Sequence, residues 1–231
     1  MTHSMERGLY IAASGMLSEQ VRQDLISHDL ANASTPGYKA DRVASKSFGE
    51  MLLGDTANGG PIGSLGLGTQ IDQQVTDMSP APIRDTGEPM DFAVEGDGFF
   101  SVRTSGGVRY TRDGQFAASA RGTLVTAAGD DVLGSNGAPI RIGTDGKILP
   151  SEIGVVSLKN AAREGDNLFT GTAGGTAAGT VRAGALEGSG VNPITTMVEM
   201  IGSLRAFESG QRVITTIDST LSKAANQVGS I

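Results

Sequence analysis

The two ends of the chain repeat apolar residues at the spacing of an α-helix. Residues 5–34 contain no proline, and apolar side chains recur there every three or four positions. A helix of about 30 residues is about 45 Å long. This is long for a helix that covers a small globular core. One broad face of this predicted helix carries Leu9, Ala13, Met16, Leu17, Val21, Leu25 and His28.

The first helix is expected to end at the sequence Thr35-Pro36-Gly37. A residue that precedes proline is pushed toward an extended conformation. Pro36 and Gly37 suit the two central positions of a type II turn, because proline fixes φ and glycine accepts a positive φ. We therefore predict a helix-ending turn at Pro36 and Gly37.

The last helix is predicted to start after Asn192. Asparagine is a good N-cap, and Pro193 fits the first helical position. No proline follows, and apolar residues step by three, four or seven positions along the rest of the chain. The apolar set comprises Met200, Leu204, Phe207, Ile214, Ile217, Leu221, Ala224 and Val228.

From about residue 70 to residue 170 the pattern changes to short β-prone runs such as FFSVRT, VRYT, TLVT, PIRI, KIL and GVVSL. Between them stand turn pairs of the Asp-Gly, Asn-Gly and Gly-Gly type, at 97–98, 106–107, 113–114, 136–137 and 145–146. Closely spaced strands with such turns predict antiparallel β structure. The glycine-rich segments near 54–68 and 171–190 are predicted to be linkers or loops, with one short strand near Val181.

These elements predict an α+β fold, with long N- and C-terminal helices that form a coiled-coil-like pair and a central antiparallel β domain. Residues 1–40 and 192–231 are expected to form a helical assembly domain, and residues 41–191 a β-rich domain. The alternative that the pattern leaves open is one compact α+β domain, in which both helices pack on the sheet.

Composition narrows the classes of function. Glycine is frequent, with 34 of 231 residues, which favours turns. The net charge is −7 and no Lys/Arg cluster occurs, which disfavours binding to nucleic acid or to an anionic membrane. The absence of cysteine excludes disulfides and thiolate catalysis. His3 and His28 alone cannot form a multi-histidine metal site.

Signals for membranes and for known catalytic motifs are missing from the sequence. No run of 18 apolar residues occurs, and no basic and then apolar N-terminal stretch is present, so we expect neither a membrane span nor a cleaved signal peptide. The segment GTAGGTAAG lacks the Lys-Ser/Thr of a phosphate-binding loop. No Gly-Xaa-Ser-Xaa-Gly elbow appears.

A hydrolase, for example one that acts on cell-wall glycan, is the enzymatic alternative. Its acid and base would come from carboxylates. Most of these side chains are better explained as turn and surface residues, because aspartate before glycine is typical of turns. We therefore predict no enzyme, no catalytic residue, no metal and no cofactor. The candidate carboxylates are Asp91, Glu95, Asp97, Asp130 and Asp131.

Several of these segments resemble the rod and hook family of bacterial flagellar axial proteins. GLYIAASGML and LANASTPGYKA are similar to the family's N-terminal signature, and VEGDGFFSV, RYTRDGQF and GTLVTAAGDDVLG to its central β signature. GDNLF, GALEGSGVNPITTMVEMI and LRAFE also match. The matches occur in the family's order and cover most of the chain.

The resemblance implies a structural subunit that is exported through the flagellar type III apparatus without signal cleavage. Such subunits polymerise into a hollow helical tube that transmits torque, located in the basal body outside the cytoplasmic membrane. The expected partners are further copies of the chain and other rod and hook proteins. A distal rod subunit is favoured by the segment GSLGLGTQI, with a proximal rod or hook-type protein as the alternative. A secreted surface-adhesive subunit is a more distant alternative.

The assembly interface is expected to be a buried seam of apolar residues on both terminal helices. Its predicted residues are Leu17, Val21, Leu25, Leu204, Phe207, Ile214, Ile217 and Leu221.

Overall fold

A computed structural model describes residues 2–47, 50–54, 61–66, 68–143, 148–165, 167–177 and 179–228. The chain forms two compact units. The first contains residues 1–30, 41–75 and 193–231, and the second contains residues 31–40 and 76–192. These units group residues 31–40 with the β-rich part and residues 41–75 with the helices, whereas the predicted domains divide the chain at residues 40 and 191.

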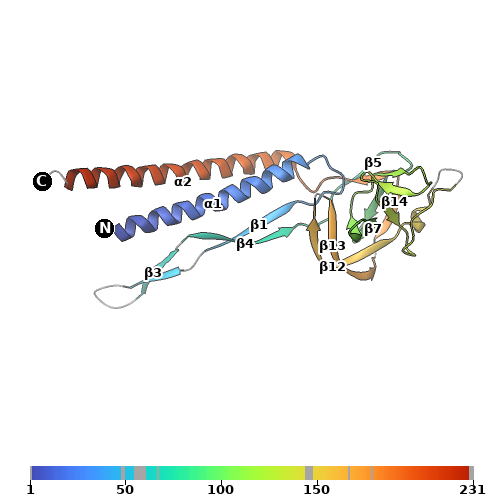
Figure 1. The fold of residues 1–231 in the computed structure, drawn as a ribbon, viewed down its shortest axis with the longest axis horizontal. Helices are drawn as coiled ribbons and strands as arrows, with labels where there is room; N and C mark the ends of the chain where they lie inside the picture. The colour runs from blue at the N-terminus through green and yellow to red at the C-terminus, as the bar shows by residue number, and fades with distance from the viewer. Residues whose placement is uncertain are drawn as a thin grey trace. The chain divides into compact units, whose positions relative to one another are not determined.

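The first unit contains the two predicted terminal helices, α1 (Thr2–Ala31) and α2 (Pro193–Val228). Figure 1 shows them side by side. α2 starts directly after Asn192, with Pro193 in its first position. The prediction of long N- and C-terminal helices is therefore confirmed. Neither helix has, within the described residues, the length of apolar sequence that would cross a membrane.

Three contacts show that α1 and α2 run antiparallel. The hydroxyl of Ser203 donates a hydrogen bond of 2.6 Å to the carboxylate of Glu19. Further along α2, the Cα of Gly210 lies beside Met16, since a Cβ there would be 2.7 Å from the Met16 side chain. Near the start of α1, a Cβ on Gly8 would lie 3.4 Å from Ile217. Glycine lets the helices approach closely at these two positions.

Four strands that lie between α1 and α2 in the sequence also belong to the first unit. They pair two by two. β1 (Asp41–Ser47) pairs with β4 (Thr69–Thr76), and β2 (Glu50–Gly54) pairs antiparallel with β3 (Pro61–Gly66). The prediction of a linker near 54–68 is therefore wrong for Gly54 and residues 61–66, while residues 55–60 and 67 lie outside the described residues. Backbone pairing between strands needs no large side chains, so glycine-rich sequence can still form this ladder.

The second unit is built from antiparallel strands. A seven-stranded sheet has the order β12-β13-β8-β7-β11-β10-β9, and β12 also pairs with β7. Strands β12, β13, β8 and β7 therefore form a closed ring of pairs. The strands are β7 (Phe99–Thr104), β8 (Gly107–Thr111), β9 (Phe116–Ala118), β10 (Leu124–Thr126), β11 (Asp131–Leu133), β12 (Val155–Glu164) and β13 (Leu168–Thr176), with a 3-10 helix at Pro150–Glu152.

Two further antiparallel pairs complete this unit. β6 (Phe92–Glu95) pairs with β14 (Thr180–Ala183), and β5 (Ile83–Asp85) pairs with β15 (Ala185–Glu187). The prediction of antiparallel β structure is confirmed. For residues 171–190, the predicted short strand near Val181 is confirmed as β14, while the predicted loop is wrong where β13 and β15 lie. Their small residues fit positions beside other backbones; a Cβ on Gly179, for instance, would lie 2.4 Å from the carbonyl oxygen of Asp97.

The predicted runs PIRI and KIL do not form named strands among the described residues. PIRI contributes only isolated bridges, at Pro139 and Arg141. In KIL, the first residue lies outside the described residues, and Ile148 is buried without belonging to a strand. Ile140 and Ile148 are buried in the core, which explains their apolar side chains, whereas Leu149 is 61% exposed. The turn pair at 145–146 also lies outside the described residues.

Phenylalanine side chains form the centre of the core in the second unit. Phe100 is fully buried and packs edge-on against Phe116, with 5.3 Å between the ring centroids. Phe116 also contacts Phe92, at 6.2 Å. Aliphatic residues from the surrounding strands and from the segments that connect them complete the cluster: Val94, Val102, Leu124, Val132, Ile140, Ile148, Ile153 and Val155.

We predict that Phe100→Ala lowers the free energy of unfolding of the second unit by about 3–5 kcal/mol, because it leaves a cavity in the core. Val108→Ala is the matched control on the neighbouring strand, since Val108 is 44% exposed. Chemical denaturation followed by circular dichroism measures both variants. Equal losses for the two would contradict the assignment of this core.

Candidate functional site

The segment after α1 folds into a turn that belongs to the second unit. α1 ends at Ala31, and turn residues separate it from Pro36 and Gly37. The Tyr38 amide donates to the Thr35 carbonyl oxygen at 3.4 Å, which closes a four-residue turn. Pro36 and Gly37 occupy its central positions, and Gly37 has a φ of +66°. This positive φ is the conformation that glycine tolerates best.

Gly37 is also required by its surroundings. A Cβ at this position would lie 2.3 Å from the carbonyl carbon of Arg112. The Gly37 amide donates a 2.9 Å hydrogen bond to the carbonyl oxygen of Glu187. Next in the chain, Tyr38 is fully buried, and the guanidinium of Arg163 lies 4.6 Å from its ring centroid. The turn is therefore packed into the β-rich unit rather than lying on its surface.

Three charged side chains meet beneath this turn, and we call Lys39, Arg112 and Glu187 the buried ion cluster. None of them is more than 2% exposed. The Lys39 ammonium lies 2.7 Å from one carboxylate oxygen of Glu187, and the Arg112 guanidinium lies 3.0 Å from the other. The amide of Ala81 donates to the Glu187 carboxylate as well, at 2.8 Å. One carboxylate thus accepts hydrogen bonds from three separate segments.

Backbone carbonyls complete the coordination of the two cations. Lys39 donates to the carbonyl oxygen of Ser79 at 2.7 Å, and Arg112 donates to that of Gly96 at 2.8 Å. The Arg112 guanidinium also lies 5.1 Å from the ring centroid of Phe99. The single carboxylate of Glu187 balances only one of the two positive charges. The carbonyl oxygens and the ring face stabilise the other.

Burial sets the direction of two pKa shifts in this region. Burial lowers the pKa of the Lys39 ammonium, while the hydrogen bond and the charge of Glu187 oppose that shift. Burial raises the pKa of the Asp113 carboxyl, and hydrogen bonds from Gln115 and Asn167 oppose it. The Asn167 side chain also donates to the carbonyl oxygen of Pro36, at 3.0 Å, so Asp113 is linked to the turn.

The turn also contacts the segment that precedes α2. The Ser189 hydroxyl donates to the carbonyl oxygen of Asn32 at 3.0 Å, and the Gly190 amide donates to that of Tyr38 at 2.8 Å. The ends of the 31–40 segment and of the 76–192 segment meet as well, because the Asp77 amide donates to the Ala40 carbonyl at 2.8 Å. All four points at which the chain enters or leaves the second unit are therefore held close to the turn.

The predicted assembly residues divide into two groups. Leu17, Val21 and Leu204 are 64%, 40% and 45% exposed. The others are half-buried: Leu25, Phe207, Ile214, Ile217 and Leu221. Ile217 faces Gly8 of α1. The role of these eight residues in assembly stays a prediction.

Comparison with known proteins assigns the chain to a family. The model "Flagella basal body rod protein" matches residues 9–39, "Flagellar hook protein FlgE/F/G D1 domain" matches 93–158, and "Flagellar basal body rod FlgEFG protein C-terminal" matches 182–228. The flagellar basal-body rod protein FlgG of Bacillus subtilis strain 168 is 34% identical over 263 aligned residues, which cover 96% of this chain and 99% of the relative. The chain belongs to the flagellar basal-body rod protein family.

Other rod proteins align over their whole length. The flagellar basal-body rod protein FlgF of Caulobacter vibrioides is 29% identical, and the alignment covers 98% of this chain and 100% of the relative. The flagellar hook-basal body complex protein FlhO of Bacillus subtilis is 28% identical over the same shares. These matches confirm the resemblance to rod proteins that the sequence motifs indicate.

Each of the three matched regions of this rod-family chain supplies one residue of the buried ion cluster. Lys39 ends the first region, Arg112 lies in the second and Glu187 in the third. Sequence reasoning singled out all three segments as family motifs but missed the cluster. Lys39 is the only charged residue of LANASTPGYKA, but RYTRDGQF also contains Arg109 and Asp113, and nothing in one sequence pairs these charges with Glu187.

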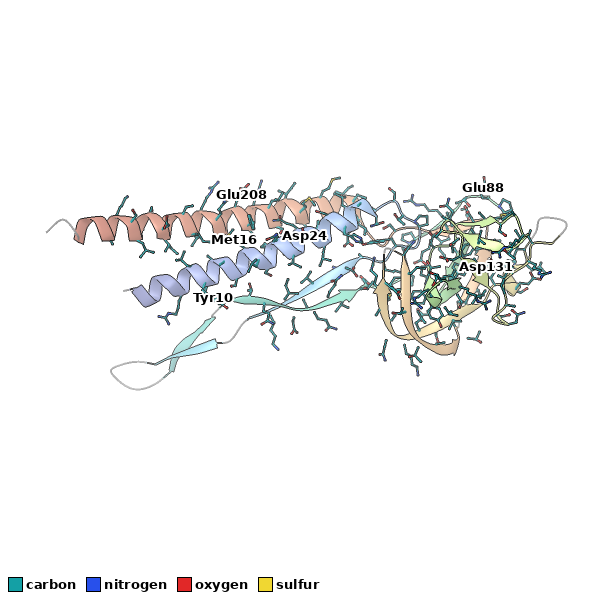
Figure 2. The ribbon with its side chains drawn as sticks, viewed as in Figure 1. Tyr10, Met16, Asp24, Glu88, Asp131 and Glu208 are labelled. Atoms are coloured by element: carbon teal, nitrogen blue, oxygen red, sulfur yellow. The ribbon has the colours of Figure 1, made fainter. Side chains whose placement is uncertain are left out.

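The carboxylates of the hydrolase alternative have other interactions. Glu95 pairs with Arg182 at 3.4 Å, and Asp131 accepts a hydrogen bond from Thr123 at 3.1 Å. Asp97 is exposed and Asp130 is half-buried, and Figure 2 shows Asp131 in the β-rich unit. Asp91 is buried, at 7% exposure. Among the described residues no group of three His, Cys, Asp or Glu side chains is arranged to hold a metal ion.

We predict that Glu187→Gln destabilises the protein by about 3–5 kcal/mol, since it leaves two buried cations without their counter-charge. Glu164→Gln is the matched control, because Glu164 pairs with Arg109 at 2.6 Å but is 52% exposed. That change should cost at most about 1 kcal/mol. Urea unfolding curves compare the two, and a loss below about 1 kcal/mol for Glu187→Gln would sink the idea that the cluster holds the turn.

We predict that Gly37→Ala is more destabilising than Gly137→Ala by about 1–3 kcal/mol. Both glycines have a positive φ, +66° and +74°, so both variants bear a similar backbone cost. Only at Gly37 would the new methyl group collide with another backbone, since nothing lies within 4 Å of a Cβ at Gly137. Thermal unfolding of both variants tests this, and equal shifts in Tm would argue against the close packing of the turn.

Proposed function

We propose that the protein is a structural subunit of the flagellar basal-body rod, which polymerises into a hollow helical tube and transmits torque. The observation that supports this proposal most directly is the incomplete burial of apolar side chains on the terminal helices. They contact each other, yet most large apolar residues of α2 stay exposed or half-buried within the described chain. Each such side chain contributes about 1.5–3 kcal/mol when it becomes fully buried. Assembly with neighbouring copies supplies that burial.

The antiparallel contact of α1 and α2 supports a coiled-coil-like pair as the assembly element. Fixing the helices costs conformational entropy, which burial against neighbours offsets. We therefore propose that the helices are loosely ordered in the dilute monomer and become fixed in the polymer. The proposed seam consists of Leu17, Val21, Leu25, Leu204, Phe207, Ile214, Ile217 and Leu221.

The buried ion cluster supports a mechanical role for the second unit. The segment that follows α1 and the segment that precedes α2 both belong to this unit and are hydrogen-bonded to each other, at Asn32 and Tyr38. A force that acts on either helix connection therefore reaches the same packed region of the β-rich unit. A subunit that transmits torque needs such stiff connections and no reacting group, so we propose a non-enzymatic role without a cofactor.

The proposal includes the partners and the location that the family implies. The names of the similar proteins place them in the flagellar basal body, and we propose the same location for this chain, after export by the type III apparatus without signal cleavage. Its partners would be further copies and other rod and hook proteins. We favour the distal part of the rod, with a proximal position or a hook-type role as the alternative.

We predict that Phe207→Asp or Ile214→Asp abolishes assembly while the second unit stays folded. A charge on this half-buried face cannot be buried between copies without a large desolvation cost. Gln211→Asp is the control, because Gln211 is exposed on the same helix. Electron microscopy of concentrated protein measures assembly, and circular dichroism checks the fold. If both variants formed rods like those of the wild-type protein, the result would contradict the proposed seam.

A further inference from the structure

Three segments that surround the carboxylate of Glu187 form a layer of their own within the second unit. They are the turn segment 35–40, the segment 79–87 that includes β5, and the segment 184–191 that includes β15. We call these three segments together the lock. The hydrophobic core cluster of the unit is separate from the lock, since its members come from residues 92–181.

The segment 184–191 is hydrogen-bonded to the turn segment through its backbone. The Gly190 amide donates to the Tyr38 carbonyl oxygen at 2.8 Å. In return, the Gly37 amide donates to the Glu187 carbonyl oxygen at 2.9 Å. A Cβ on Gly190 would lie 3.2 Å from the same Tyr38 oxygen, so a larger residue has little room there. The two segments therefore pack directly against each other.

The same segment is also bonded to residues 79–87. β15 pairs with β5 in antiparallel register, and next to this pair the Gly188 amide donates to the Pro82 carbonyl oxygen at 2.9 Å. At the other end of the pair, the Thr86 amide donates to the Gly184 carbonyl oxygen at 2.8 Å. The pairing therefore extends over most of both segments.

The buried ion cluster joins all three segments at one point. The Glu187 carboxylate accepts hydrogen bonds from Lys39 of the turn segment and from the Ala81 amide. Lys39 also donates to the carbonyl oxygen of Ser79. Arg112, which follows β8 and lies outside the lock, donates to the second carboxylate oxygen of Glu187. One carboxylate therefore links the segments of the lock to each other and to the sheet.

Moving one segment alone out of this arrangement would leave polar groups of the others unsatisfied. Without residues 184–191, Lys39 and Arg112 would stay buried without their carboxylate, which is strongly unfavourable. Without the turn segment, the Gly190 amide would lose its acceptor, and the space of the fully buried Tyr38 would be empty. Opening all three segments at once instead lets water solvate every freed group.

The sheet of the second unit is stabilised in a different way. Its strands surround the phenylalanine and aliphatic side chains of the core. In the lock, the buried apolar side chains among the described residues are those of Tyr38, Ala185 and Val191. Regions with few buried apolar contacts open at a lower free energy than the core of the same protein. The lock is therefore expected to open while the sheet stays folded.

We propose that the lock opens and closes as one cooperative element, independently of the sheet. The turn segment follows α1 and the segment 184–191 leads to α2. Closing the lock thus fixes the connections to both helices in one step, and opening it releases both together. The inference goes beyond the proposed rod function, because it concerns a single chain and holds whether or not the chain polymerises.

Native-state hydrogen exchange of the 231-residue wild-type chain tests this inference, read by mass spectrometry in urea concentrations below the unfolding transition. We expect the three segments to share one protection factor within about threefold, and β7 and β11 to be protected at least about tenfold more strongly. The amides that report on the lock donate hydrogen bonds within it: Gly37, Tyr38, Ala81, Thr86, Gly87, Gly188, Gly190 and Val191.

The variant Glu187→Gln supplies a perturbation at the centre of the lock. It should lower the protection of all three segments by the same factor, about a hundredfold or more, because two buried cations lose their counter-charge. β7 and β11 should keep their protection. Glu164→Gln is the matched control and should change none of these values, since the Glu164 side chain is 52% exposed and its partner is Arg109.

Three results would overturn the lock as an element of its own. In the wild-type chain these are unequal protection of the three segments, or protection of the lock equal to that of β7 and β11. In Glu187→Gln it is the loss of protection in β7 and β11 together with the lock. Each measurement uses unassembled protein, so failure of the lock leaves the rod function standing, and electron microscopy of assembled protein judges that function separately.

Discussion

The carboxylate of Glu187 holds together parts of the chain that lie far apart in sequence. It accepts hydrogen bonds from Lys39, from Arg112 and from the Ala81 amide, all in a buried setting. Desolvating three charges is costly, and only good geometry and further hydrogen bonds offset that cost. Here carbonyl oxygens of Ser79 and Gly96 supply them. The cluster therefore defines one arrangement of the turn with little tolerance for others.

The terminal helices, in contrast to the buried ion cluster, leave large apolar side chains exposed. Among the described residues, their contacts include Gly210 with Met16, Gly8 with Ile217 and Ser203 with Glu19, while large apolar side chains such as Ile194 and Leu17 stay exposed. A single chain thus combines a β-rich unit with a filled core and helices whose burial is incomplete. This division matches a subunit whose fold is completed by its neighbours.

The sequence alone predicts the features that depend on residues close together in the chain, and it does not predict those that depend on distant residues. The terminal helices were readable, because a period of three to four residues and the Asn192-Pro193 start are local signals. The strands between residues 41 and 76 were missed because β1 and β4 are mostly polar and β3 contains two glycines, so backbone pairing rather than an apolar pattern defines them. The ion cluster was missed because its partners are 148 and 75 residues apart, and no local pattern pairs Lys39 or Arg112 with Glu187.

All four points at which the chain enters or leaves the second unit lie close to the turn. This arrangement affects how such proteins can diverge. Because Asn32 meets Ser189 and Ala40 meets Asp77, the β-rich unit is attached through closely spaced ends. Units attached in this way tolerate replacement and insertion, since the rest of the chain sees only the spacing of the attachment points. The β-rich unit can therefore be enlarged, trimmed or exchanged in evolution without a change in the helices.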